Sequence, residues 1–200
     1  MNEDALPRSP ELMSRGDTAL LVIDAQERLL PAIADSLRIV WNIRRLVDAA
    51  KLLGMPVMAT EQYPKGLGPT VADLAQRLGE IPAKKRFSAG GCPAIFADLR
   101  GRGFRNILLT GVEAHVCVAQ TAMDLMTDGW RVFVAADAVG SRFDVDYRFA
   151  LQRMDSAGAT LTTAEAAMFE WCETADAPEF KQISRLARET PPGNASAAHA

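Results

Sequence analysis

The stretch that decides the fold is Asn106-Ile107-Leu108-Leu109-Thr110-Gly111-Val112-Glu113-Ala114-His115-Val116-Cys117-Val118. Its first half is a short apolar run, which is typical of a parallel strand covered on both faces. Beyond it, Val118, Ala122 and Leu125 recur at steps of four and three, which predicts a helix. Gly129 is typical of a helix end. The stretch therefore predicts a buried strand that runs into a helix, with Cys117 in the first helical turn.

This position makes Cys117 a candidate nucleophile. Ligands of open α/β sheets bind at the carboxyl edge of the strands. Unpaired N–H groups and the positive end of the helix dipole at that edge favour a thiolate over a thiol. The alternative is that Cys117 is a small buried apolar residue, as most free cysteines are. Position alone leaves both interpretations open.

The composition is that of one soluble globular domain. The chain has 200 residues, of which 48% are hydrophobic and 24% charged. Its net charge is −3 and its 22 basic residues form no long block, so we expect no nucleic-acid or membrane partner. Met1–Asp17 lacks the apolar core of a secretory signal, and no apolar run approaches the roughly 20 residues that span a bilayer.

The cysteines and histidines limit the possible chemistry. Cys92, Cys117 and Cys172 are an odd number without a CxxC pair, which argues against a disulfide framework and a cysteine zinc site. A cytoplasmic location is the simplest expectation, and Cys92 is interpreted as structural. A histidine-assisted hydrolase would depend on His115, because His199 lies in the C-terminal tail.

Strands and helices alternate along the chain. We predict strands at 18–23, 56–60, 81–87, 106–110, 131–136 and 159–162. Between and after them we predict helices near 39–53, capped by Ser36, and at 71–78, 94–99, 118–128, 146–157, 164–172, capped by Thr163, and 179–188. This alternation predicts an α/β fold with a six-stranded, mostly parallel sheet and helices on both faces. The domain spans 17–189, between an N-terminal extension at 1–16 and a disordered tail at 190–200.

Polar residues at strand ends suggest a site. Asp24 ends the first strand, although a helix-capping aspartate is the commoner explanation. Lys84, Lys85 and Arg86 lie on a strand that suits a sheet edge, where lysines deter unwanted pairing. If they share one crevice with Cys117, a lysine would lower the pKa of the thiol and the aspartate would accept its proton. The N–H groups at the start of the Val118 helix would receive an oxyanion.

Three motifs in the chain resemble those of the isochorismatase-like cysteine hydrolases. They are Leu21-Val22-Ile23-Asp24-Ala25-Gln26, Lys84-Lys85-Arg86-Phe87-Ser88-Ala89 and Gly111-Val112-Glu113-Ala114-His115-Val116-Cys117-Val118-Ala119-Gln120-Thr121-Ala122. The similarity spans about residues 15–170. It is strongest to the subgroup that has the loop Glu61-Gln62-Tyr63-Pro64-Lys65-Gly66-Leu67-Gly68 and the nucleophile turn Glu-Ala-His-Val-Cys.

The resemblance implies a Rossmann-like three-layer αβα sandwich and a catalytic triad of Asp24, Lys84 and Cys117. It also implies a cis peptide bond between Val112 and Glu113, a bond type that costs about 3–4 kcal/mol without proline. Nicotinamidase-type members carry Asp and His metal ligands after the second strand. The corresponding segment, 59–65, has neither, so we expect no metal and no other cofactor.

The nucleophilic cysteine favours hydrolysis of an amide or related C–N bond of a small molecule through a thioester. The resemblance places the substrate pocket at Gln26, Gln62, Phe87, Val112, Glu113 and His115. For Glu113 and His115 the alternative is a structural role at the helix N-terminus, either by capping it or by hydrogen bonding to the neighbouring loop. Such an enzyme predicts a Cys117 thiolate that titrates well below roughly 8.5.

Two other function classes remain to be weighed. The first is a catalytically idle member that acts as an oligomeric scaffold or ligand-binding protein. Family members commonly assemble, so a homo-oligomer is expected for the enzyme as well. The second, a nucleotide-binding Rossmann domain, is disfavoured because no GxGxxG follows Ile23.

Overall fold

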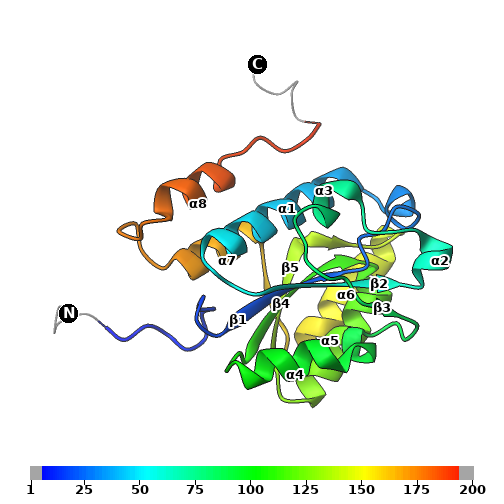
Figure 1. Cartoon of the computed structure of the whole chain (residues 1–200), viewed down its shortest axis with the longest axis horizontal. Coiled ribbons are helices and arrows are strands. Elements are labelled where there is room, and N and C mark those ends of the chain that lie inside the picture. The colour runs from blue at the N-terminus through cyan, green and yellow to red at the C-terminus, as the bar shows by residue number, and fades with distance from the viewer. Residues whose placement is uncertain (1–5, 194–200) are drawn as a thin grey trace.

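A six-stranded sheet forms the centre of the molecule (Figure 1). The computed structural model describes residues 6–193. The strands are β1 (Thr18–Ile23), β2 (Val57–Gln62), β3 (Ala83–Lys84), β4 (Asn106–Val112), β5 (Arg131–Gly140) and β6 (Thr160–Thr162). Their order is β3-β2-β1-β4-β5-β6 and each neighbouring pair is parallel.

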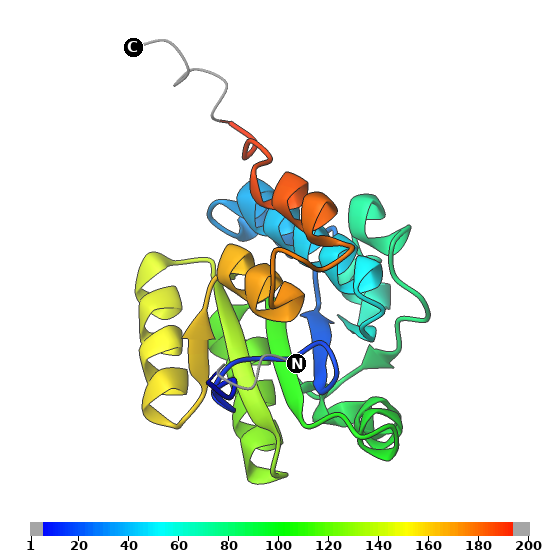
Figure 2. The same ribbon diagram turned by 90° about the vertical axis from the view of Figure 1, so that its left-hand side faces the viewer.

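Helices cover both faces of this sheet, which gives three layers (Figure 2). One face carries α1 (Ser36–Leu52), α3 (Ala72–Ala75), α7 (Ala164–Cys172) and α8 (Phe180–Ala187), and the other carries α4 (Pro93–Gly101), α5 (Ala119–Thr127) and α6 (Asp144–Ser156). Short turns of helix lie in the connections: α2 (Pro64–Leu67), two 3-10 turns (Leu30–Ala32 and Ala89–Gly91) and a π-helical turn (Ala114–Val118). The predicted Rossmann-like αβα sandwich is confirmed.

The sheet is buried on both sides by two apolar clusters. In β1, Leu20 and Val22 belong to the cluster that includes α1 and α7. The alternate residues Ala19, Leu21 and Ile23 belong to the cluster beneath α4 and α5. Because both faces of the strand are covered, its sequence is continuously apolar rather than alternating.

The structure corrects several predicted boundaries. The strand expected at 81–87 pairs only at Ala83–Lys84, because it is an edge strand and its chain turns into a 3-10 segment shortly afterwards. The helix expected at 71–78 is the single turn α3. Ser36 is the first residue of α1 and does not cap it, since Asp35 occupies the cap position in a left-handed conformation. The Thr163 cap is confirmed, because its side chain accepts a hydrogen bond from the N–H of Ala166.

The described part of the N-terminal extension, residues 6–16, is fastened to α7. Arg8 Nη2 donates to the carbonyl oxygens of Met13 and Glu170 at 2.8 and 2.7 Å. The N–H of Met13 donates to Glu170 Oε2 at 2.9 Å, and Met13 is fully buried. Of the predicted disordered tail, residues 194–200 lie outside the described residues. Among residues 6–193, no helix has the length and apolar character needed to traverse a bilayer.

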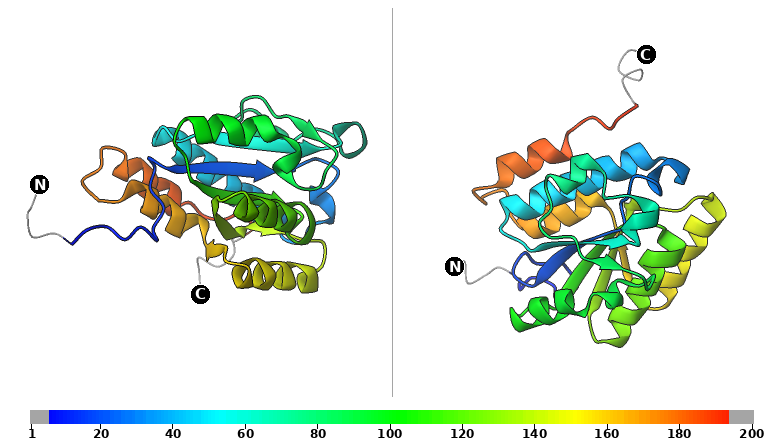
Figure 3. Two further views of the ribbon diagram at one scale, coloured as in Figure 1. Left: turned by 90° about the horizontal axis from the view of Figure 1, so that it is seen from below. Right: turned by 45° about the vertical axis from the view of Figure 1, so that its right-hand side comes forward.

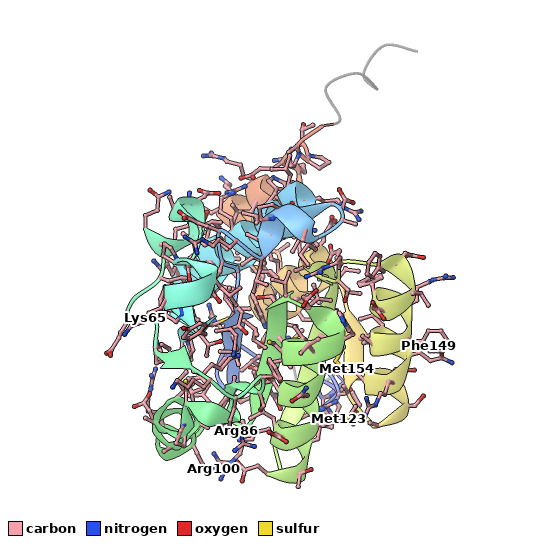
Figure 4. All side chains as sticks on the ribbon, turned by 90° about the vertical axis from the view of Figure 1, so that its right-hand side faces the viewer. Lys65, Arg86, Arg100, Met123, Phe149 and Met154 are labelled. Carbon is pink, nitrogen blue, oxygen red and sulfur yellow. The ribbon has the colours of Figure 1, made fainter. Side chains whose placement is uncertain are left out.

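All six strands end on the same side of the molecule because they are parallel. In Figure 3 the arrow of β1 points toward this side, and Figure 4 looks directly onto it. Asp24 follows β1, Lys84 ends β3, and the π-helical turn that contains Cys117 follows β4. The fold thus brings three separate parts of the chain to one edge of the sheet.

Candidate active site

A buried ion pair joins the first two of these segments. Lys84 Nζ lies 2.7 Å from Asp24 Oδ2, and both side chains are fully buried. Since β2 lies between β3 and β1, the lysine side chain reaches Asp24 across the end of β2. Asp24 has a left-handed backbone, with φ of 53°. Thr60, on β2, donates its hydroxyl to Asp24 Oδ1 at 2.9 Å. The carboxylate is therefore part of a buried polar network, not a helix cap.

The position of the Lys84 ammonium is fixed by several acceptors. Besides Asp24, Nζ donates to Gln62 Oε1 at 2.9 Å and to the carbonyl oxygens of Phe87 and Arg86 at 2.7 and 3.3 Å. Buried charges are stable only when they are paired and hydrogen-bonded, as this one is. Because these bonds come from β2 and from the chain after β3, they hold the lysine tightly in one geometry.

The carboxyl group of Asp24 is more basic than an ordinary aspartate. Burial raises the pKa of Asp24 above its usual 3.8, and the charge of Lys84 lowers it only in part. A carboxylate with a raised pKa accepts a proton more readily, which is the property required of a general base.

The pKa of the Cys117 thiol is raised, whereas the sequence led us to expect a lowered pKa. Cys117 is only 5% exposed. Burial, followed by the negative charge of Asp24, raises the pKa of Cys117 to about 12, although Lys84 acts in the opposite direction. The physical reason is that the ammonium is paired with Asp24, while the carboxylate lies next to the sulfur. Burial and the nearby carboxylate therefore favour a protonated sulfur at rest.

The backbone before Cys117 departs from the simple strand-to-helix turn that the sequence predicts. A π-helical turn over Ala114–Val118 precedes α5 in place of that simple turn. The Val112–Glu113 peptide bond is cis, as the family resemblance implies. Gly111 has a φ of 110°, and a Cβ at this position would collide with the backbone of Ile23. Only glycine therefore allows β4 to pass this close to β1.

A further residue, Thr121, anchors this turn. Its hydroxyl donates to the carbonyl oxygen of Cys117 at 2.6 Å and accepts the N–H of Ala89 at 2.8 Å. Thr121 thereby ties the nucleophile turn to the segment after β3. Sequence reasoning assigned no role to Thr121 or Thr60, and their placement at strand and helix ends was the available signal.

Comparisons with known proteins agree with this architecture. The model of the isochorismatase domain matches residues 18–166. Isochorismatase domain-containing protein 2 from Homo sapiens is 40% identical over 178 residues, which cover 88% of this chain and 86% of that protein. The chain belongs to the isochorismatase family.

Solved structures share the fold. The MAR1 ribonuclease from Caenorhabditis elegans has a TM-score of 0.84 and 39% identity, covering 92% of this chain and 96% of that one. The YcaC gene product of Escherichia coli has a TM-score of 0.82 and 25% identity, covering 91% and 93%. The latter is described as an octameric hydrolase of unknown specificity.

Three of the residues expected to bind substrate are buried instead. Val112 is fully buried. Gln26 is also fully buried, and its side chain donates to the carbonyl oxygens of Gln62 and Gly68 and accepts the N–H of Gln62 at 2.7 Å. The side chain of Gln62 joins Lys84 to the carbonyl oxygen of Lys85. In this isochorismatase-family chain the two glutamines fix the loop after β2 and the lysine, so they position the site.

The other three expected residues have side chains that are partly accessible. Phe87 is 52% exposed. His115 Nδ1 lies 2.9 Å from Ser141 Oγ, and Nε2 lies 3.9 Å from Asp146 Oδ2. The carboxylate of Glu113 lies 4.0 Å from Arg142 Nε. Neither side chain caps the helix N-terminus. The contact of His115 with Ser141 agrees with the other structural alternative, hydrogen bonding to a neighbouring loop, and Glu113 lies near Arg142 of the same loop.

A cavity of about 450 Å³ is lined by residues that follow Lys84 and flank Cys117 in the chain. Its walls include Lys85, Arg86, Phe87, His115, Met123 and Arg153. Ala119 and Gln120, two and three positions after Cys117, also line it. Residues 6–193 contain no group of three or more His, Cys, Asp or Glu side chains arranged to hold a metal ion.

Proposed function

We propose that this protein is a cysteine hydrolase that cleaves an amide or related C–N bond of a small molecule. Membership of the isochorismatase family supports hydrolase chemistry. The observation that carries the proposal is the contact of Lys84 Nζ with Asp24 Oδ2 at 2.7 Å, next to the thiol of Cys117. In this arrangement a basic carboxylate faces a protonated nucleophile, which is the pairing that general-base catalysis requires.

In the first half of the reaction the thiol attacks the carbonyl carbon of the substrate. The proton of the sulfur passes to Asp24 as the C–S bond forms and the carbonyl oxygen becomes an oxyanion. The N–H groups of Val116 and Val118 already donate to the carbonyl oxygen of Glu113. We therefore assign the oxyanion to the N–H of Cys117 itself, in place of the Val118 helix N–H groups expected from the sequence.

The intermediate then collapses to a thioester. The C–N bond breaks, and Asp24 returns its proton to the departing nitrogen, which leaves as ammonia or an amine. In the second half a water molecule loses a proton to Asp24 and attacks the thioester carbonyl. The C–S bond breaks, a carboxylic acid leaves, and the sulfur regains its proton. Lys84 keeps Asp24 in place throughout and stabilises its charged form.

The test is the release of ammonia from a panel of small primary amides. We expect turnover by the native chain and none by Cys117→Ala, while Cys172→Ala serves as the control because Cys172 lies on α7, far along the chain from the site. Mass spectrometry of the protein during turnover is expected to find an acyl adduct on the peptide that contains Cys117. Turnover that survives in Cys117→Ala would contradict the proposal.

The alternative of a catalytically idle scaffold is opposed by the site itself. The buried Asp24 carboxylate and Lys84 ammonium are costly to keep in a protein interior unless they serve a purpose, because replacing such a pair with apolar residues is often neutral or stabilising. Ribonuclease activity is a second candidate function, because one relative of known structure is named as a ribonuclease. The full burial of both charged side chains favours a small substrate over a polynucleotide, and RNA therefore belongs in the activity panel.

We also propose that the protein forms a homo-oligomer in the cytoplasm. Several large apolar side chains are exposed around α6, namely Phe143, Val145 and Phe149, at 61, 50 and 67%. Phe149 projects outward from α6 in Figure 4. The octameric YcaC relative supports self-association. The three cysteines of the chain are unpaired, which suits a reducing compartment. Light scattering of the native chain and of Phe149→Ser tests the assembly, and a monomeric native chain would contradict it.

A further inference from the structure

The cavity of about 450 Å³ is enriched in positive charge. Three cations line it: Lys85, Arg86 and Arg153. Its walls contain one carboxylate, that of Asp124, which lies 3.5 Å from Arg86 Nη2. Within residues 6–193, neither Lys85 nor Arg153 has a carboxylate within 4.0 Å of its charged nitrogen atoms. The cavity therefore presents two cations that no protein carboxylate neutralises.

The cavity also has an apolar wall. Phe87 and Met123 line it, and Phe87 is 52% exposed although its carbonyl oxygen accepts a hydrogen bond from Lys84 Nζ. His115 and Ala119, two positions to either side of Cys117, also line the cavity. Cys117 itself is not among the lining residues, but the cavity adjoins its segment of the chain on both sides. A small molecule bound there is therefore expected to reach the sulfur with one end and the two cations with the other.

We propose that this cavity is a subsite for an anionic group, and that the substrate is a small amide whose far end carries a carboxylate. The inference rests on the proposed function and extends it to a substrate class. Phe87 and Met123 would contact the carbon chain of the substrate. Arg153 and Lys85 would bind the carboxylate, since a guanidinium presents paired N–H donors to its two oxygen atoms and an ammonium adds a point charge.

The test compares two alkylating reagents that differ chiefly in charge, iodoacetate and iodoacetamide. Both are applied at pH 9, and mass spectrometry follows the peptide that contains Cys117. The quantity of interest is the ratio of the iodoacetate rate to the iodoacetamide rate, divided by the same ratio for N-acetylcysteine. We expect this normalised ratio to lie about two- to fivefold above one, the size of effect that exposed charge pairs produce.

Two variants test whether the preference for iodoacetate arises from the cavity. Lys85→Met and Arg153→Met are each expected to bring the normalised ratio down toward one while the iodoacetamide rate stays near that of the native chain. Lys51→Met is the matched control, because Lys51 is an exposed lysine on α1, on the opposite face of the sheet, and its loss changes the net charge equally. The control variant is expected to keep the native ratio.

A normalised ratio at or below one, or one that both cavity variants leave unchanged, would overturn the inference. So would a Cys117 that neither reagent modifies, because the cavity would then not lead to the sulfur. Hydrolysis is measured separately, with succinamate and its uncharged counterpart butyramide. If alkylation prefers the anion but no amide in the panel is hydrolysed, the hydrolase proposal fails while the anionic subsite stands.

Discussion

The reactivity of Cys117 toward a neutral alkylating reagent is expected to be low at pH 8 and to increase steeply with pH. A pKa of about 12 leaves about one thiolate in ten thousand at pH 8. An ordinary cysteine, with a pKa near 8.5, is about one quarter ionised at that pH. At this pH the thiolate fraction of an ordinary cysteine is thus about two-thousandfold larger than that of Cys117. A more basic thiolate is also more nucleophilic, which offsets roughly 25- to 55-fold of this difference. The net expectation is alkylation roughly 40- to 100-fold slower than that of a free cysteine.

The assay follows iodoacetamide labelling of the Cys117 peptide from pH 7 to 10 by mass spectrometry, which separates this residue from Cys92 and Cys172. The logarithm of the rate is expected to rise with unit slope and without a plateau, because the pKa lies above the range. A plateau below pH 9, or a rate at pH 7 above that of free cysteine, would refute the reasoning, since it would show a resting thiolate stabilised by Lys84.

The substitution Asp24→Asn distinguishes a Cys117 thiol that is protonated at rest from a Cys117 thiolate at rest. The charge of Asp24 raises the pKa of the thiol, and Lys84 lowers it. Removal of the carboxylate is therefore expected to lower the pKa and to speed labelling at pH 8 about tenfold or more, while hydrolysis is lost with the base. Asp98→Asn, an exposed carboxylate on α4, is the control. Slower labelling in Asp24→Asn would mean that the carboxylate activates the sulfur at rest.

Three further predictions concern stability and turnover. Lys84→Met is expected to abolish hydrolysis and to lower the free energy of unfolding by about 3–5 kcal/mol, because it leaves the buried Asp24 carboxylate without its cation. Ammonia release measures the first effect and urea unfolding the second. Gly111→Ala is expected to prevent folding or to cost more than about 4 kcal/mol, because the new Cβ would collide with the backbone of β1, whereas Gly101→Ala meets no atom within 4 Å and leaves the melting temperature nearly unchanged. Folding raises the pKa of Cys117. The contribution of its thiol to stability is therefore present below pH 9 and declines as pH rises toward 12. In this window the free energy of unfolding of the native chain is expected to fall by up to about 1.4 kcal/mol per pH unit relative to that of Cys117→Ala. Equal pH dependence of the two chains in urea unfolding would contradict this sign.

The sequence by itself determined the architecture and the place of Cys117, the proposed nucleophile. Continuous apolar runs such as Ala19–Ile23 are possible only for strands covered on both faces, and their alternation with helical stripes requires a parallel sheet. Parallel strands end on one side, so the residues that follow β1 and β4 had to share an edge. The short edge strand at Lys84 could be expected as well, because charged residues suit a sheet edge. These are properties of local pattern and chirality.

Only the tertiary structure decided the electrostatic state of the site. From the sequence, the Lys84 ammonium was expected to stabilise a Cys117 thiolate. In the folded chain the ammonium is paired with Asp24, and burial with the nearby carboxylate holds the proton on the sulfur. In the same way, Gln26 was expected in the substrate pocket but is bound to backbone groups in the interior. Pairing and desolvation depend on distances of a few ångströms between residues far apart in the chain, and no local pattern encodes them.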